Sequence, residues 1–177
     1  QPVKLVSYVP GLCPESGCVM QKSEIESVID SYGAAARRAR EAGFDAVELH
    51  GAHGYLINQF LSPLTNRRTD SYGGTPEKRM HFALRVLERV KAFAGEDFPV
   101  IFRMDSLEGY PGGLTLEDTM PIAKALVDAG VDALHVSAGI YESGLDVPSA
   151  YTPRAWNVDN AAALRKAVEA RVPVIAV

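Results

Sequence analysis

The 177-residue chain has few cysteines and no long apolar run. Its two cysteines, Cys13 and Cys18, are too few for the disulfide framework of a small secreted domain, and a zinc site would need more ligands at closer spacing. The longest apolar runs have the length of a strand, as in residues 172–177, so no transmembrane helix is predicted. No signal peptide is visible. These absences predict a cytoplasmic location.

The chain also lacks an excess of charge of either sign. It has 18 basic and 22 acidic residues, a net charge of −4. Nucleic-acid-binding domains and proteins that bind anionic membranes carry basic surfaces, so neither partner is predicted. Charged residues make up 23% and hydrophobic residues 47% of the chain, which is typical of a globular domain with a sizeable core.

From Ser23 onward, helical and strand patterns alternate. Ser23 and Glu26 have the spacing of a capping box, and Thr75 and Thr115 are placed to cap two further helices. The predicted helices cover about 23–43, 75–95 and 115–130, and a fourth opens at Asp159 or Asn160 and continues to about residue 170. The predicted strands cover 45–50, 98–103, 131–137 and 172–177.

Repeated strand–helix units with apolar strands predict an α/β fold whose parallel sheet is buried on both faces. Two architectures compete, a (β/α)₈ barrel and a doubly wound open sheet. No Gly-x-Gly-x-x-Gly motif follows any predicted strand, and polar residues follow several strands, which favours the barrel. A complete barrel has eight strands and about 250 residues. Residues 23–177 are therefore predicted to form a partial TIM barrel of about four units, preceded by a loop or short hairpin over residues 1–22.

The densest cluster of reactive side chains follows the first of these four strands. His50, His53 and Tyr55 lie where this strand passes into a loop, and active sites of α/β proteins are usually built at such positions. The two histidines can donate hydrogen bonds to a carbonyl or anionic oxygen. Tyr55, with an ordinary pKa of about 10, can protonate a basic carbon. This set suits reduction of an activated double bond.

Two other interpretations of the cluster stay open. The residues can be ordinary loop and core positions, or the histidines can bind a metal, as in a hydrolase. Zinc needs a third protein ligand, and the other histidines, His81 and His135, are distant in the sequence. No metal is therefore predicted.

Arg103 ends the second predicted strand and is the other candidate. An arginine at the end of an apolar strand needs a partner. Asp105 and Glu48 are candidate carboxylate partners, and an anionic ligand is the alternative, because a guanidinium stays charged at all relevant pH values. The polar segment 66–74 is predicted to have a structural role, with an Arg–Asp pair inside a turn.

Residues 50–63 (HGAHGYLINQFLSP), followed by residues 66–74 (NRRTDSYGG), resemble the Old Yellow Enzyme family of FMN-dependent oxidoreductases. The resemblance continues through residues 98–103, 111–115 and 134–139. It is strongest toward the bacterial ene reductases, NADH:flavin oxidoreductases and 2,4-dienoyl-CoA reductases. It implies a (β/α)₈ barrel with FMN at the carboxyl ends of the strands, and NADH or NADPH as the reductant.

The resemblance also implies a role for each candidate residue. His50 and His53 would bind the electron-withdrawing oxygen of a small-molecule substrate, an α,β-unsaturated carbonyl compound, and Tyr55 would donate the proton to its α-carbon. Arg103 would contact the FMN edge that becomes negative on reduction. Family members also hold FMN with the first three strands and with loops after strands seven and eight. This chain carries only the equivalents of strands four to seven. The alternative is a half-barrel without flavin or catalysis that forms a homo-oligomer over its open sheet edges.

Overall fold

The computed structural model of the protein describes residues 2–12, 14–145 and 152–177. The strands are β1 (Lys4–Leu5), β2 (Cys18–Val19), β3 (Val47–Gly51), β4 (Val100–Asp105), β5 (Ala133–Ser137) and β6 (Val174–Ala176). The helices are α1 (Lys22–Glu41), α2 (Leu56–Leu61), α3 (Pro76–Ala94), α4 (Leu116–Asp128) and α5 (Val158–Ala167). The predicted α/β class, with helices and strands in alternation, is confirmed.

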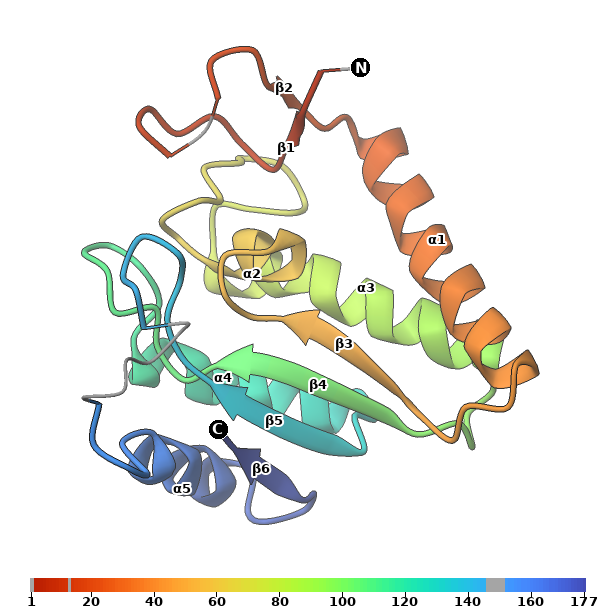
Figure 1. The fold of residues 1–177 in the computed structure, drawn as a ribbon. Helices are drawn as coiled ribbons and strands as arrows, with labels where there is room; N and C mark the ends of the chain where they lie inside the picture. The colour runs from red at the N-terminus through yellow and green to blue at the C-terminus, as the bar shows by residue number, and fades with distance from the viewer. Residues whose placement is uncertain (1, 13, 146–151) are drawn as a thin grey trace.

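The main sheet has four parallel strands whose spatial order, β3-β4-β5-β6, follows their order in the chain. A doubly wound sheet needs a point at which the strand order reverses, and the four strands described here contain no such reversal. With sequential parallel strands, the crossover helices lie on one face of the sheet. Figure 1 shows α3 and α4 behind the sheet formed by β3, β4 and β5.

The core lies between this helix-covered face and the helices. Because side chains alternate between the faces of a strand, every second residue of the central strands points toward the helices. Leu49 of β3, Phe102 of β4 and Leu134 of β5 are almost completely buried there. Ile25 and Ile29 of α1 join the same core from the helix layer, as do the buried residues of the other helices, Phe82, Val86, Leu87, Val90, Leu126 and Leu164.

Helix starts agree with the predictions where a threonine caps them and differ elsewhere. Thr75 and Thr115 accept hydrogen bonds from the backbone three residues later, as predicted. The predicted capping box at Ser23 and Glu26 is wrong, because the N-cap of α1 is Gln21, two residues before Ser23, and the Gln21 backbone N–H donates to Glu24. Glu26 instead binds the Tyr72 hydroxyl and Arg85 of α3. Helix α5 begins at Val158, slightly before the predicted Asp159 or Asn160.

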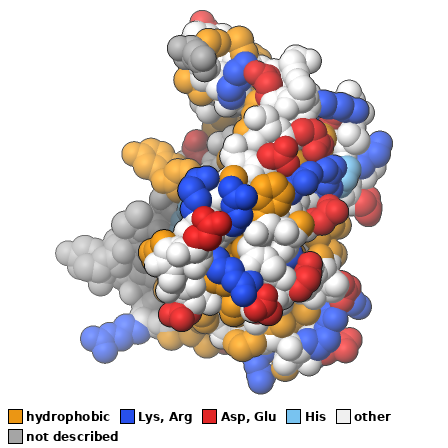
Figure 2. Space-filling view, turned by 90° about the vertical axis from the view of Figure 1, so that its right-hand side faces the viewer, with side chains coloured by type: hydrophobic (Ala, Val, Ile, Leu, Met, Phe, Trp, Pro, Cys, Tyr) orange, Lys and Arg blue, Asp and Glu red, His pale blue; other side chains and the backbone are white. Residues whose placement is uncertain are grey.

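Helices α1 and α3 pack along each other and present charged side chains to solvent. Arg85 of α3 pairs with Glu26 of α1 at 2.9 Å, and Arg89 pairs with Asp30 at 3.0 Å. Figure 2, which views the side of the molecule on which α1 lies, shows basic and acidic side chains interspersed. This face therefore carries no patch of one sign.

The N-terminal segment is tied to the loop that precedes α3. Strands β1 and β2 pair in parallel, so this segment is not the short hairpin that was one of two alternatives. Arg68 donates to the Val6 and Met20 carbonyls, both at 2.9 Å. Cys13 lies outside the described residues. Among the helices that the structure describes, none combines the length and the apolar character needed to cross a membrane.

Candidate functional site

The face of the sheet opposite the helices, called here the inner face, is lined by polar side chains. Strand register places His50, Arg103 and His135 side by side on β3, β4 and β5. Asp105 and Ser137 form the next pair toward the carboxyl ends of the strands. The structure therefore brings together all four predicted site residues, because the turn after His50 returns His53 and Tyr55 to this end of the sheet.

The rings of His53 and Tyr55 both lie close to the His50 ring. The His50 and His53 rings lie 5.2 Å apart between centroids in an edge-to-face arrangement, and the Tyr55 ring lies 5.0 Å from His50. Tyr55 is 62% exposed. A phenol in this position is open to a ligand, and the His50 imidazole lies beside it.

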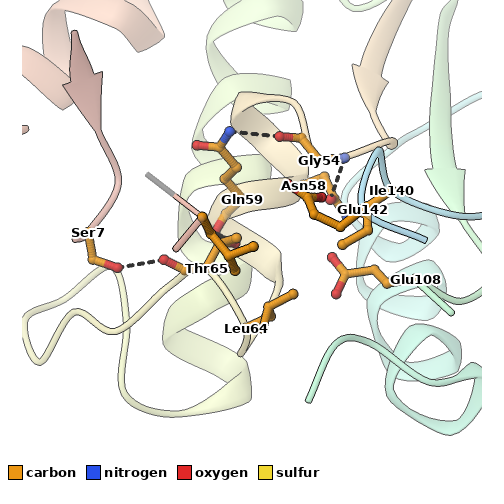
Figure 3. Close-up of a pocket in the computed structure, with 10 residues that line it drawn as sticks. Ser7, Gly54, Asn58, Gln59, Leu64, Thr65, Glu108, Ile140 and Glu142 are labelled. Carbon is orange, nitrogen blue, oxygen red and sulfur yellow. Dashed lines mark hydrogen bonds between the residues drawn. The ribbon is translucent and has the colours of Figure 1, made fainter. Parts of the chain in front are cut away.

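The turn between β3 and α2 has an unusual backbone. His53 and Gly54 have φ angles of 60° and 74°, a left-handed conformation that non-glycine residues rarely adopt. Asn58 Oδ1 accepts from the Gly54 amide at 2.9 Å, and Gln59 Nε2 donates to the Gly54 carbonyl at 2.7 Å (Figure 3). Helix α2 therefore holds the turn that presents His53 and Tyr55.

Helix α2 was not predicted, although its sequence carried a signal. Ile57 and Phe60 are completely buried, and Leu56 and Leu61 extend the same helical spacing. The helix has only six residues, and Tyr55 at its N-cap makes no side-chain cap bond. The start signals used for the longer helices were therefore missing.

Arg103 forms no ion pair with any of the described residues, so neither proposed carboxylate partner holds it. Glu48 binds His135 Nδ1 instead, at 2.7 Å, and Asp105 accepts the His53 backbone N–H at 2.8 Å. Arg103 Nη2 donates to Ser137 Oγ at 3.5 Å, and the buried Nε has no hydrogen-bond partner in the described part of the chain. Its guanidinium is thus a charged donor available to an acceptor on the inner face.

Burial and neighbouring cations lower the pKa of His50. Desolvation is the largest cause, followed by the charge of Arg103, and Glu48 opposes them. Both main causes penalise the imidazolium form. His50 is therefore a neutral hydrogen-bonding group near pH 7.

A small cavity of about 60 Å³ adjoins the turn and is lined in part by Gly54, Asn58 and Glu108 (Figure 3). Glu108 is 1% exposed, and its Oε2 accepts from Ser62 Oγ at 2.7 Å and from the Leu114 amide at 2.8 Å. Burial raises its pKa. This carboxyl connects the loop after β4 to the end of α2, and no sequence pattern had singled it out.

The segment 66–74 has the structural role predicted for it. Arg68 and Asp70 form a bidentate pair at 2.7 and 3.1 Å, and Asn66 Nδ2 donates to the Phe60 and Tyr72 carbonyls. These bonds are internal to the loop and its supports. In the described residues, no group of three or more His, Cys, Asp or Glu side chains is arranged to hold a metal ion.

Comparison with known proteins decides the family. Residues 13–177 match the model of the NADH:flavin oxidoreductase / NADH oxidase family. The chain belongs to this family. An NADH oxidase of Thermoanaerobacter brockii is 50% identical over 159 residues, which are 88% of this chain and 24% of that protein. An NADPH dehydrogenase of a Geobacillus strain (WCH70) is 48% identical over 120 residues, 68% of this chain and 35% of that protein.

Solved structures of the family share the fold. A 2-naphthoyl-CoA reductase in complex with 2-naphthoyl-CoA superposes with a TM-score of 0.91 at 30% identity, covering 99% of this chain and 27% of that one. The Old Yellow Enzyme homologue of Zymomonas mobilis superposes with a TM-score of 0.77 at 27% identity, covering 100% of this chain and 51% of that one. The chain thus spans about a quarter to a half of the proteins it resembles. The predicted family membership is confirmed.

The inner face fits the flavin that the family name implies. A reduced flavin carries negative charge, and Arg103 offers a permanent cation whose buried Nε has no partner among the described residues. That unsatisfied donor is the feature of this chain that a flavin edge would complete, since a buried N–H without a partner is costly. The charge and the unsatisfied donor of Arg103 therefore fit an anionic flavin edge.

Proposed function

We propose that this chain forms the substrate-binding part of an FMN-dependent reductase, which reduces activated C=C bonds of α,β-unsaturated carbonyl compounds with NAD(P)H. The supporting observation is the contact of His50, His53 and Tyr55 at the same strand ends as Arg103. The four-stranded, sequentially ordered sheet is then half of a (β/α)₈ barrel, because the barrel is the common architecture with this strand order and a site at the carboxyl ends.

In this proposal the histidines bind the substrate oxygen. Negative charge develops on that oxygen as the double bond is reduced, and donors fixed in advance stabilise such charge strongly. The centroids of the two rings lie 5.2 Å apart, and both imidazoles are proposed to donate to the same oxygen.

Tyr55 is the proposed general acid. Its exposed phenol lies beside His50, so it lies within reach of a carbon attached to the bound carbonyl. Its role is to deliver a proton to the α-carbon, which is basic once the β-carbon has been reduced.

Arg103 is the proposed cofactor contact. The chemistry that a bound FMN supplies is hydride transfer to the β-carbon, with NAD(P)H as the source of electrons. Arg103 provides the permanent positive charge that favours the anionic form of the cofactor.

The Tyr55→Phe variant of the flavin-loaded protein tests the acid. We expect olefin reduction to slow by about 10²–10⁴-fold, the usual contribution of a general acid, while reduction of the flavin by NAD(P)H stays within about twofold. Stopped-flow spectroscopy measures the two half-reactions separately. Equal loss of both would refute the role of Tyr55, and a protein that stays colourless with added FMN would favour the half-barrel without catalysis.

The His50→Ala variant tests the oxygen site through equilibrium binding. Phenols resemble the enolate of a substrate and bind without reacting. We expect their dissociation constant to rise about tenfold or more, because one hydrogen bond to a charged acceptor contributes about 1.5–3 kcal/mol. His81→Ala is the matched control, since His81 lies on α3 and binds the Ser71 carbonyl. Unchanged phenol affinity in His50→Ala would contradict the assignment.

A further inference from the structure

Asp105 contacts His53 in two ways. Its Oδ2 accepts the His53 backbone N–H at 2.8 Å, which supports the left-handed backbone at that residue. Its Oδ1 lies 3.7 Å from His53 Nε2. The same ring nitrogen lies 2.7 Å from Ser137 Oγ. One carboxylate therefore touches both the backbone and the ring of a residue in the proposed oxygen site.

Both members of this pair are withdrawn from water. The side chain of Asp105 is 0% exposed and that of His53 is 11% exposed. A buried carboxylate is costly unless a cation or several donors accompany it. The imidazolium form of His53 provides such a cation, with Nε2 lying 3.7 Å from Asp105 Oδ1.

The other charged and titratable groups around His53 do not reverse this balance. Arg103 is a like charge, and its Nη2 donates to Ser137 Oγ at 3.5 Å, whereas Asp105 Oδ1 lies 3.7 Å from the His53 ring nitrogen itself. His135 is compensated by its own partner, Glu48, at 2.7 Å. Within residues 14–145, the charged and titratable groups that the structure places near this pair are Asp105, Arg103, His50, Tyr55, His135, Glu48 and, in the loop after β5, Glu142.

We propose that Asp105 is a positioning residue that keeps His53 doubly protonated while its neighbour His50 stays neutral. A doubly protonated imidazole has two N–H donors. One is then held by Ser137 and Asp105, and the other is a charge-assisted donor for a ligand oxygen. The oxygen site thus joins one cationic and one neutral histidine.

The presence of one cationic and one neutral histidine predicts which ligands the oxygen site prefers. A cationic donor gains most from an oxygen that carries negative charge, since charge-assisted hydrogen bonds are about twice as strong as neutral ones. Phenolates and enolates are therefore favoured over neutral ketones of the same shape. This consequence for ligands rests on the proposed function, whereas the charge of His53 does not.

The experiment is an NMR pH titration of the imidazole signals in the purified protein without flavin. We expect the ¹⁵N shifts of His53 to show both nitrogens protonated at pH 7, and its titration midpoint to lie above that of His50. Asp105→Asn keeps an oxygen for the His53 amide and removes the charge. It should lower the His53 midpoint by at least about one pH unit, as loss of an adjacent opposite charge does.

Asp132→Asn is the matched control. Asp132 also accepts a backbone N–H of β4, from Val100 at 2.8 Å, but at the opposite end of the strand. It should leave the His53 midpoint in place, and the His81 signals serve as an internal reference in all variants. If His53 is neutral at pH 7 in the unaltered protein, or if Asp105→Asn leaves its midpoint unchanged, the proposal is overturned. That result requires no variant to bind flavin, so it is independent of the proposed reductase activity.

Discussion

The two faces of the β3–β6 sheet differ in what their side chains contact. On the helix-covered face, Leu49, Phe102 and Leu134 are packed away from water. On the inner face of the same strands, His50, Arg103 and His135 form a polar row. Because side chains alternate along a strand, one short segment such as β4 supplies both sets. Stability and chemistry therefore depend on alternate residues of the same strands, and they can be perturbed separately.

The largest expected effect comes from the helix-covered face. Phe102→Ala removes a completely buried ring and should lower the free energy of unfolding by about 3–5 kcal/mol. Arg103→Gln, one residue along on the inner face, should lower it by less than about 1 kcal/mol. Urea unfolding followed by circular dichroism measures both. If both variants lose a similar free energy of unfolding, the inner face contributes to stability as much as the helix-covered face, and the comparison fails.

A smaller effect is expected at Gly51 of β3, which lies against Phe102 of β4. A Cβ atom on Gly51 would lie 2.4 Å from the Phe102 ring and 3.0 Å from the Arg103 carbonyl. Gly51→Ala should therefore cost about 1–3 kcal/mol, as overpacking usually does, and should displace the turn that carries His53. Thermal unfolding and the NMR signals of His53 report the two consequences. An unchanged melting temperature would mean that the strands separate without strain.

The smallest expected effect is a pH dependence of stability caused by Glu108, which lies in the loop after β4 and on neither face of the sheet. The folded-state pKa of Glu108 is raised by burial above its usual value of about 4.5. The folded state therefore holds its proton more tightly, and stability is lost as the pH rises from 4.5 through the raised value. Glu108→Gln removes this loss, so the stability of the variant relative to the unaltered protein should improve between pH 4.5 and 7.5. Urea unfolding at several pH values measures this difference. If the free energies of unfolding of the two proteins differ by the same amount across that range, the raised pKa is contradicted.

The sequence predicted the long elements because their signals are local. Thr75 and Thr115 lie at the helix starts they were expected to cap, and apolar strands followed by polar residues located the site end of the sheet. The cluster of His50, His53 and Tyr55 was predictable for the same reason, since all three lie within six consecutive residues.

The contacts that the sequence could not predict join distant positions. Asp105 and His53 are 52 residues apart, and Glu48 and His135 are 87 apart. Asp105 and Glu48 were both considered as partners for Arg103, because all three lie at or near strand ends. The three-dimensional structure shows instead that Glu48 binds His135 and that Asp105 contacts His53. Arg68 likewise donates, from a third segment, to the carbonyls of Val6 and Met20, the residues that follow β1 and β2.

The bond between Glu48 and His135 crosses a strand, since these residues lie on β3 and β5 with β4 between them. A shift of β4 by one residue would turn its polar side chains into the core, and a shift of β3 against β5 would break this bond. The Glu48–His135 bond therefore helps to fix the register of β3 relative to β5 across β4. Any redesign of the inner face for a new ligand should keep Glu48 and His135 and vary the residues nearer the carboxyl ends of the strands.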